Sequence, residues 1–136
     1  MATMVLTSTA VTVNAVDYSD HVQKAELALE VDAQDTTNFA SLGWKESQGG
    51  LKSGTLSITF LNDYAASAVD ANLWALFGTV TTFAVKPTSD DPSATNPEYS
   101  GSVLVDKYTP LTGAPGDMAL AEVQWTLSGA VSRATA

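Results

Sequence analysis

Few residues in this 136-residue chain could do chemistry, since it has one histidine and no cysteine. His21 follows the acidic turn Asp17-Tyr18-Ser19-Asp20, and any Ser-His-Asp arrangement would have to be built on it. Without a thiol, the chain also lacks a cysteine nucleophile, a thiolate metal site and a disulfide framework. We interpret His21 as a surface residue of the turn, not as a catalytic base.

The remaining candidate motifs lack the spacing that their chemistry needs. The acids of the Asp17–Asp20 turn and the pair Asp90-Asp91 could offer oxygen ligands to calcium, but neither has the spacing of a calcium-binding loop. The pair Gly49-Gly50 is not followed by the Lys-Ser/Thr of a phosphate-binding loop. Glu26 and Glu30 could exchange protons, yet they lie along one solvated strand face. We therefore expect no enzyme, no metal and no cofactor.

The charge balance excludes ordinary nucleic-acid binding. Fifteen acidic and six basic residues give a net charge of −9, and the acids are spread over the chain. An acidic surface repels phosphate, and scattered cations cannot displace counterions as a basic patch does. The amino terminus lacks the pattern of a signal peptide, and no segment approaches the ~20 apolar residues of a membrane span. We expect a soluble, unexported single domain, residues 1–136, with no membrane partner.

Alternating polar and apolar residues predict a mainly β fold that positions these side chains. The clearest alternation covers residues 22–32, 55–61 and 119–127, and weaker strand patterns occur at 11–14, 79–86 and 99–109. Two apolar rows are expected to face the core: Ala25, Leu27, Leu29 and Val31, and Ala121, Val123, Trp125 and Leu127.

One helix is predicted at about residues 65–77. Asn62 and Asp63 suit the position before a helix, and Gly78 suits the position after its end. Trp74 falls near the edge of the apolar stripe, so we assign it to a contact between subunits. The stripe expected to pack in the core consists of Val69, Leu73, Leu76 and Phe77.

The segment from Ala33 to Gly54, here called the arm, has neither a helical nor a strand period. A connection this long is uncommon in a compact domain unless it is functional or disordered. Its large apolar residues argue against disorder, and no local core could bury them. We expect the arm to pack on another molecule, with Trp44 as its anchor, through Phe39, Leu42, Trp44 and Leu51.

Three stretches together resemble the major tail proteins, or tail tube proteins, of long-tailed (siphovirus-type) phages of actinobacteria. They are LKSGTLSITFLNDYAASAVDANLWALFGT, AVKPTSDDPSATNPEYSGSVLVDKYTPL and GDMALAEVQWTLSGAV. The resemblance implies a β-sandwich or β-barrel subunit with one flanking helix. It also implies a hexameric ring, stacking of rings into a tube, other tail components such as tape measure and tail terminator as partners, and a place in the virion tail after assembly in the host cytoplasm.

A tube for DNA needs a polar strand face along its channel. The most regular polar faces in the chain are those of residues 22–32 and 119–127, and an acidic channel would let DNA pass as cargo without sticking. The expected lumen residues are Glu26, Glu30, Asp32, Glu122 and Gln124. The alternative is a non-enzymatic β-sandwich module, a decoration or adhesin domain, whose arm and 88–97 loop contact a carbohydrate or a receptor.

Overall fold

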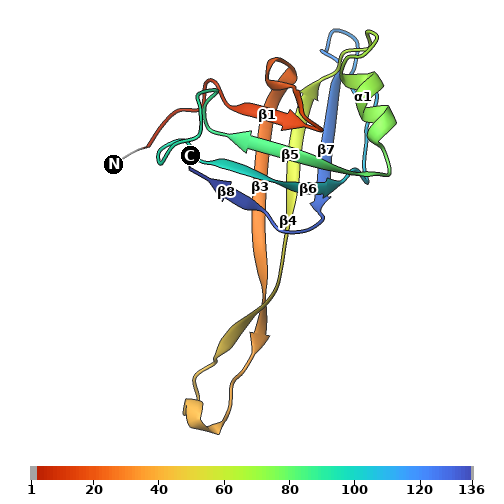
Figure 1. Ribbon diagram of the computed structural model, residues 1–136. Helices are drawn as coiled ribbons and strands as arrows, with labels where there is room; N and C mark the ends of the chain where they lie inside the picture. Colours follow the sequence, from red (N-terminus) through yellow and green to blue (C-terminus); the bar gives the residue numbers. More distant parts are fainter. Residues whose placement is uncertain (1–2, 136) are drawn as a thin grey trace.

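The computed structural model describes residues 3–135 and has a mainly β fold, as the alternation predicted (Figure 1). Its one α-helix, α1, covers Val69–Leu76. The strands are β1 (Ala10–Val13), β2 (Val16–Asp17), β3 (Val22–Asp35), β4 (Ser47–Leu61), β5 (Val80–Lys86), β6 (Glu98–Leu104), β7 (Leu120–Leu127) and β8 (Ser132–Ala134).

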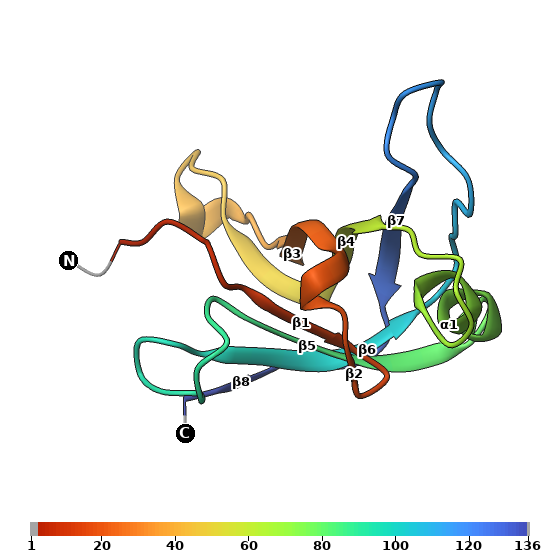
Figure 2. The same cartoon turned by 90° about the horizontal axis from the view of Figure 1, so that it is seen from above.

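The strands form one antiparallel sheet that folds into two crossing layers. The strand order is β2-β1-β5-β6-β7-β4-β3, and β8 pairs with β6. In Figure 1, β3, β4 and β7 run lengthwise, and β1, β5, β6 and β8 cross them in the other layer, which Figure 2 shows from above. The layers join where β6 meets β7, through only two residue pairs, Val103–Leu127 and Leu104–Thr126. The result is a sandwich whose layers cross steeply.

The core lies between the two layers and is built by strand alternation. Leu56, Ile58 and Phe60 of β4 point inward and are almost completely buried. Trp125 of β7 packs against Phe60, and its indole N–H donates to the Lys107 carbonyl at 2.9 Å, so its polar atom is satisfied inside the core. The opposite layer contributes Val11, Val13, Phe83 and Val103.

The predicted inward row of β3 is only half correct. Ala25 and Leu27 pack against the core, but Leu29 and Val31 have 57% and 51% of their surface exposed. They keep the same side of the strand, but β3 and β4 continue past the edge of the crossing layer (Figure 1). Alternation therefore predicts the face of a strand correctly but not how much of that face is covered.

Helix α1 is shorter than predicted and ends before Phe77. Val69 and Leu73 are buried in the core and Leu76 packs at its margin. Phe77, expected in the core stripe, is 50% exposed, because its backbone leaves the helix with φ −57° and ψ 124°. Phe77 is therefore not a core residue.

Asp63 does not cap α1, although the sequence suggested a cap near this position. Its carboxylate accepts a hydrogen bond from the Ala65 N–H at 3.0 Å within the preceding turn. The helix is held instead by Tyr108, whose hydroxyl donates to the Asp70 carboxylate at 2.5 Å. Burial, together with this hydrogen bond, raises the pKa of Tyr108 to about 12.

No helix among residues 3–135 is long and apolar enough to cross a membrane.

Candidate assembly surfaces

The arm is mostly a β-hairpin and not the irregular loop that the sequence predicted. Strands β3 and β4 remain paired beyond the sandwich, through Ala33–Gly49, Gln34–Gln48 and Asp35–Ser47. Both faces of this two-stranded ribbon meet solvent, so neither face requires apolar residues and the alternation disappears. The arm extends as a stalk away from the sandwich (Figure 1).

The tip of the arm, residues 36–46, is ordered by its own hydrogen bonds. Asn38 and Ser41 form a reciprocal capping box around the short 3-10 turn Phe39–Ser41. Leu42 then adopts a left-handed conformation with φ 52°, and the Thr37 hydroxyl accepts from the Glu46 N–H at 2.8 Å. The turn is therefore held in place without help from the sandwich.

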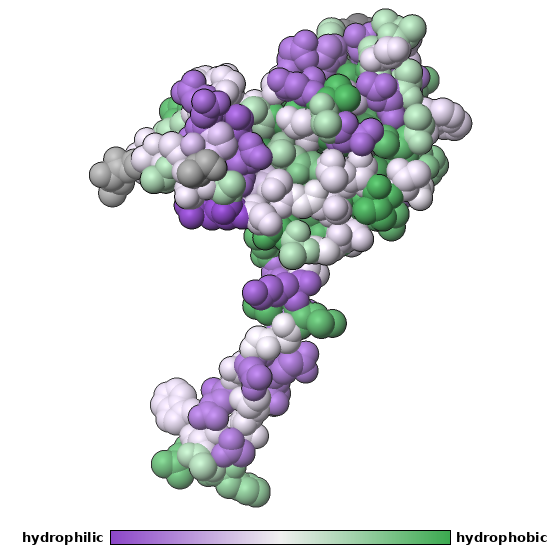
Figure 3. All heavy atoms as spheres, viewed as in Figure 1, coloured by the Kyte–Doolittle hydropathy of each residue, from purple (hydrophilic) through white to green (hydrophobic). Residues whose placement is uncertain are grey.

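The four predicted contact residues of the arm are all exposed. Phe39 is fully exposed, Trp44 is 79% exposed, and Leu42 and Leu51 are similar. Figure 3 shows apolar residues gathered at the far end of the arm, and the stalk between them and the sandwich carries both polar and apolar residues. Trp44 does not fold back onto its own sandwich, so its apolar surface is available to another molecule.

The register of the sheet brings four of the five predicted lumen residues onto one outward face of β3, β4 and β7. One row across this polar face is Glu26–Ser57–Gln124, and the neighbouring row is Lys24–Thr59–Glu122. Glu30 lies farther toward the arm, opposite Ser53. Asp32 falls where the pairing shifts between Val31 and Ala33, so it belongs to the stalk and not to this face.

Two further features of the polar face are its lysines and its row of hydroxyl groups, and the sequence interpretation did not place Lys107 there. Lys24 faces the same way as Glu122, and Lys107 joins them around a shallow depression of about 330 Å³. The central strand contributes only hydroxyl side chains to this face, from Ser53, Thr55, Ser57 and Thr59. The alternation of residues 55–61 predicts this hydroxyl row, because Thr55, Ser57 and Thr59 alternate with apolar residues, whereas the approach of Lys107 depends on the fold.

Both outer strands of the β3-β4-β7 layer have an open edge. Among residues 3–135, β3 pairs with β4 alone, and β7 meets β6 only at its last residues. Unpaired strand edges expose N–H and C=O groups that readily pair with another chain.

Beside α1, a further apolar surface is exposed. Trp74 is 68% exposed on α1, and Phe77 and Val80 follow it close by in the chain. This surface includes Trp74, which the sequence placed at the edge of the apolar stripe, and Phe77, which it placed in the core.

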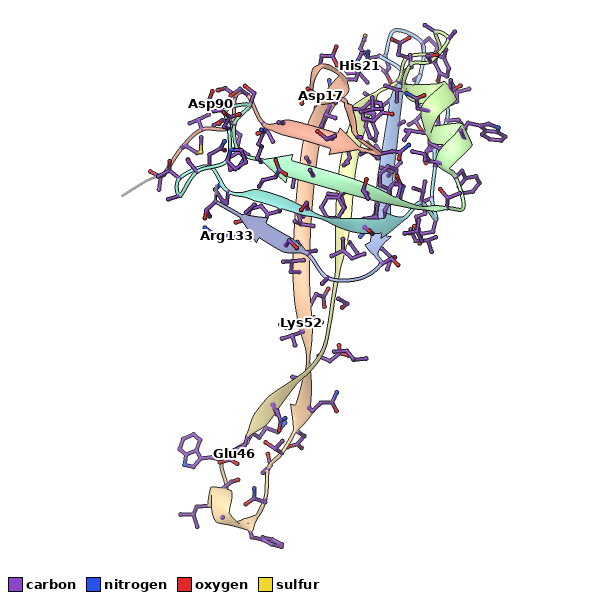
Figure 4. The ribbon with its side chains drawn as sticks, in the orientation of Figure 1. Asp17, His21, Glu46, Lys52, Asp90 and Arg133 are labelled. Carbon is purple, nitrogen blue, oxygen red and sulfur yellow. The ribbon has the colours of Figure 1, made fainter. Side chains whose placement is uncertain are left out.

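His21 links two turns through hydrogen bonds from its two ring nitrogens. Its Nδ1 lies 2.8 Å from an Asp20 carboxylate oxygen and its Nε2 lies 3.2 Å from Asp63. The hydrogen bond with Asp20 is the main reason why the pKa of His21 is raised; partial burial opposes the rise and Asp63 adds to it. Figure 4 shows His21 beside the turn that contains Asp17, far from the arm. Within residues 3–135 no three His, Cys, Asp or Glu residues are grouped as metal ligands.

Comparisons with known proteins give matches in structure only. No family model matches the chain and no curated protein matches it. A chain of the structure described as the virion of a native gene transfer agent particle matches with a TM-score of 0.74 and 17% identity, over 93% of this chain and 95% of that one.

A second solved structure is described as the tail of an empty gene transfer agent particle, computed with helical refinement and C6 symmetry. It matches with a TM-score of 0.65 and 19% identity, over 82% of this chain and 81% of that one. At such identities the likeness establishes a shared fold.

Proposed function

We propose that the chain is the structural subunit of a phage-like tail tube, in which copies close into hexameric rings and the rings stack. The observation that carries this proposal is the similarity of fold, over 93% of the chain, to a chain of a phage-like virion. The second neighbour comes from a tail with C6 symmetry, which supports a six-fold ring. The resemblance of the sequence to tail tube proteins of actinobacterial siphoviruses points to the same role independently.

The open edges of the sandwich supply a way to close such a ring. Strands β3 and β7 both run antiparallel to β4, so they are parallel to each other. Pairing β3 of one copy with β7 of the next would satisfy both edges and join the β3-β4-β7 layers into one wall. This contact joins two different surfaces, so it generates a ring when the rotation closes.

The polar face is the best candidate for the inner surface of that wall. Its central hydroxyl row offers no cation to a phosphate, and Glu26 and Glu122 flank the row from both sides. In a six-fold ring these groups would recur around the channel, and DNA would pass as cargo.

Other tail components, such as tape measure and terminator, would meet the ends of the tube in the virion tail, after assembly in the host cytoplasm.

The arm is the best candidate for the contact between rings, because its exposed apolar tip lies far from the sandwich that forms the ring. A heterologous contact of this kind repeats without closing and builds a filament.

Negative-stain electron microscopy of concentrated purified protein tests the proposal. We expect stacked rings or tubes with six-fold end views. A protein that stays monomeric at every concentration would contradict the tube and favour the alternative, a β-sandwich binding module that protects its edges.

A further inference from the structure

An apolar cleft lies at the base of the arm, on the side of β3 opposite the polar face. It has a volume of about 470 Å³ and is lined chiefly by Leu29, Val31, Leu127 and Val131. Leu29 and Val31 are the two residues of the β3 core row that the crossing layer leaves exposed. The cleft is therefore an extension of the core face that no other part of the described chain covers.

We propose that this cleft receives the arm tip of a second copy, with Trp44 inserted as the anchor. This inference rests on the proposed tube and names the acceptor of its ring-to-ring contact. The tip presents Phe39, Leu42 and Trp44 on a preorganised turn, and an apolar cleft of several hundred Å³ is large enough for such side chains. Figure 3 shows the two apolar surfaces at opposite ends of the stalk.

The charges around the two surfaces are complementary. Trp44 is followed by Lys45 and Glu46, and the cleft has one acid and one base in its lining, Glu30 and Lys52. Glu46 can meet Lys52, which lies opposite Val31 on the apolar side of the strands, whereas the Glu30 side chain points to the polar face. Figure 4 shows Glu46 near the tip and Lys52 at the neck of the arm.

The balance of charge over the whole chain favours the same contact. The arm contains two of the six basic and two of the fifteen acidic residues, so it is neutral and the rest of the chain carries the whole net charge of −9. Two sandwich bodies repel each other, whereas a neutral arm can approach an acidic body without that penalty.

The arm cannot reach its own cleft. Glu46 and Lys52 are six positions apart in nearly extended chain, which corresponds to about 20 Å. The contact must therefore join two copies, and it can be arranged in two ways. Head-to-tail repetition gives an open chain of copies, whereas two arms that exchange side by side give a closed dimer. We propose the head-to-tail arrangement, because only this arrangement stacks rings.

Because the chain has no cysteine of its own, any disulfide must join the introduced cysteines. The variant Glu46→Cys/Lys52→Cys is assembled and oxidised mildly with diamide, and the products are separated on a denaturing gel. A disulfide needs Cα atoms within about 7 Å, so the two positions cannot be joined within one chain. The control is Glu46→Cys/Lys107→Cys, which moves the second cysteine to an exposed lysine outside the cleft.

We expect a ladder of covalent multimers from the first variant and none from the control. Adding Trp44→Ala should reduce the ladder about tenfold or more, because a central aromatic anchor dominates such a contact. If the double variant fails to assemble, mixing the two single-cysteine proteins must give the covalent dimer instead.

Each contrary result has a different meaning. Normal tubes in micrographs without the Glu46–Lys52 link would overturn the cleft as acceptor and leave the tube intact. Products of the double-cysteine variant that stop at a dimer would show exchanged arms and overturn both the head-to-tail contact and the tube. A protein that stays monomeric in micrographs and on gels would overturn both as well.

Discussion

Leu73 and Trp74 are neighbours on α1 with opposite surroundings. Leu73 is completely buried, whereas Trp74 is mostly exposed. Leu73→Ala should lower the free energy of unfolding by about 2–5 kcal/mol, because it leaves a cavity in the core. Trp74→Ala should change the free energy of unfolding by no more than about 0.5 kcal/mol and act on assembly instead. Urea unfolding of both variants measures the difference, and equal losses would place Trp74 in the core.

The surroundings of His21 lead us to expect that the free energy of unfolding depends on pH. The pKa of His21 is raised above 6.5, chiefly by its hydrogen bond with Asp20. A raised pKa means that the folded state binds the proton more tightly than the unfolded state. The stabilisation is therefore complete below 6.5 and is lost as the pH rises through the folded pKa.

The measurement is the melting temperature of wild type and His21→Gln between about pH 6 and pH 8. Wild type should gain stability relative to His21→Gln as the pH falls. Both proteins share the remaining acidic groups, so the difference isolates the histidine. A constant difference in melting temperature across this range would mean that the contribution of His21 to stability does not depend on its charge.

At the scale of elements, the arm should matter for assembly and not for folding. Trp44→Ala should leave the circular dichroism spectrum and the melting temperature unchanged, because Trp44 does not pack on its own sandwich. The same change should stop tube growth, since aromatic anchors dominate interfaces. Trp44→Phe is the matched control and should retain part of the growth. Tubes of normal length from Trp44→Ala would exclude Trp44 as the anchor.

The sandwich strands could be predicted from the sequence because one face of each strand is buried and the other is exposed to solvent. The stalk could not, because hydrogen bonds between β3 and β4 hold it without any buried face. Leu29, Val31 and Phe77 were misplaced for a related reason: local pattern shows which way a side chain points but not how far a neighbouring layer extends.

Of the candidate surfaces, the arm could be predicted from the sequence and the cleft could not. The exposed apolar residues of the arm were recognisable, since no core was available for them. The cleft at its base was not, because Leu127 and Val131 approach Leu29 only through the fold. The steep crossing of the two layers, which leaves this cleft open, depends on contacts between residues far apart in the sequence.

At the scale of the whole molecule, the proposed tube would bring six or more copies of an acidic chain side by side. Each copy brings −9, so repulsion opposes assembly at low ionic strength. On the polar face, Lys24 shares a row with Glu122, which moderates the repulsion between neighbouring copies. A channel built from this face is weakly acidic and rich in hydroxyl groups. Such a wall repels DNA over a Debye length of about 8 Å without binding it.

Reversing the charge of this wall should convert the channel into a DNA-binding surface. Glu26→Lys/Glu122→Lys leaves the cleft unchanged and places new cations on both sides of the hydroxyl row. Tubes of this variant should bind short DNA with an affinity that falls steeply with salt, and the bound DNA should resist nuclease because it lies inside the channel. The control Asp90→Lys/Asp91→Lys makes the same change of charge on an exposed loop, so any DNA that it binds should remain sensitive to nuclease. Nuclease-sensitive DNA on both variants would place the polar face on the outside of the tube, and the lumen would then belong to another face of the sandwich.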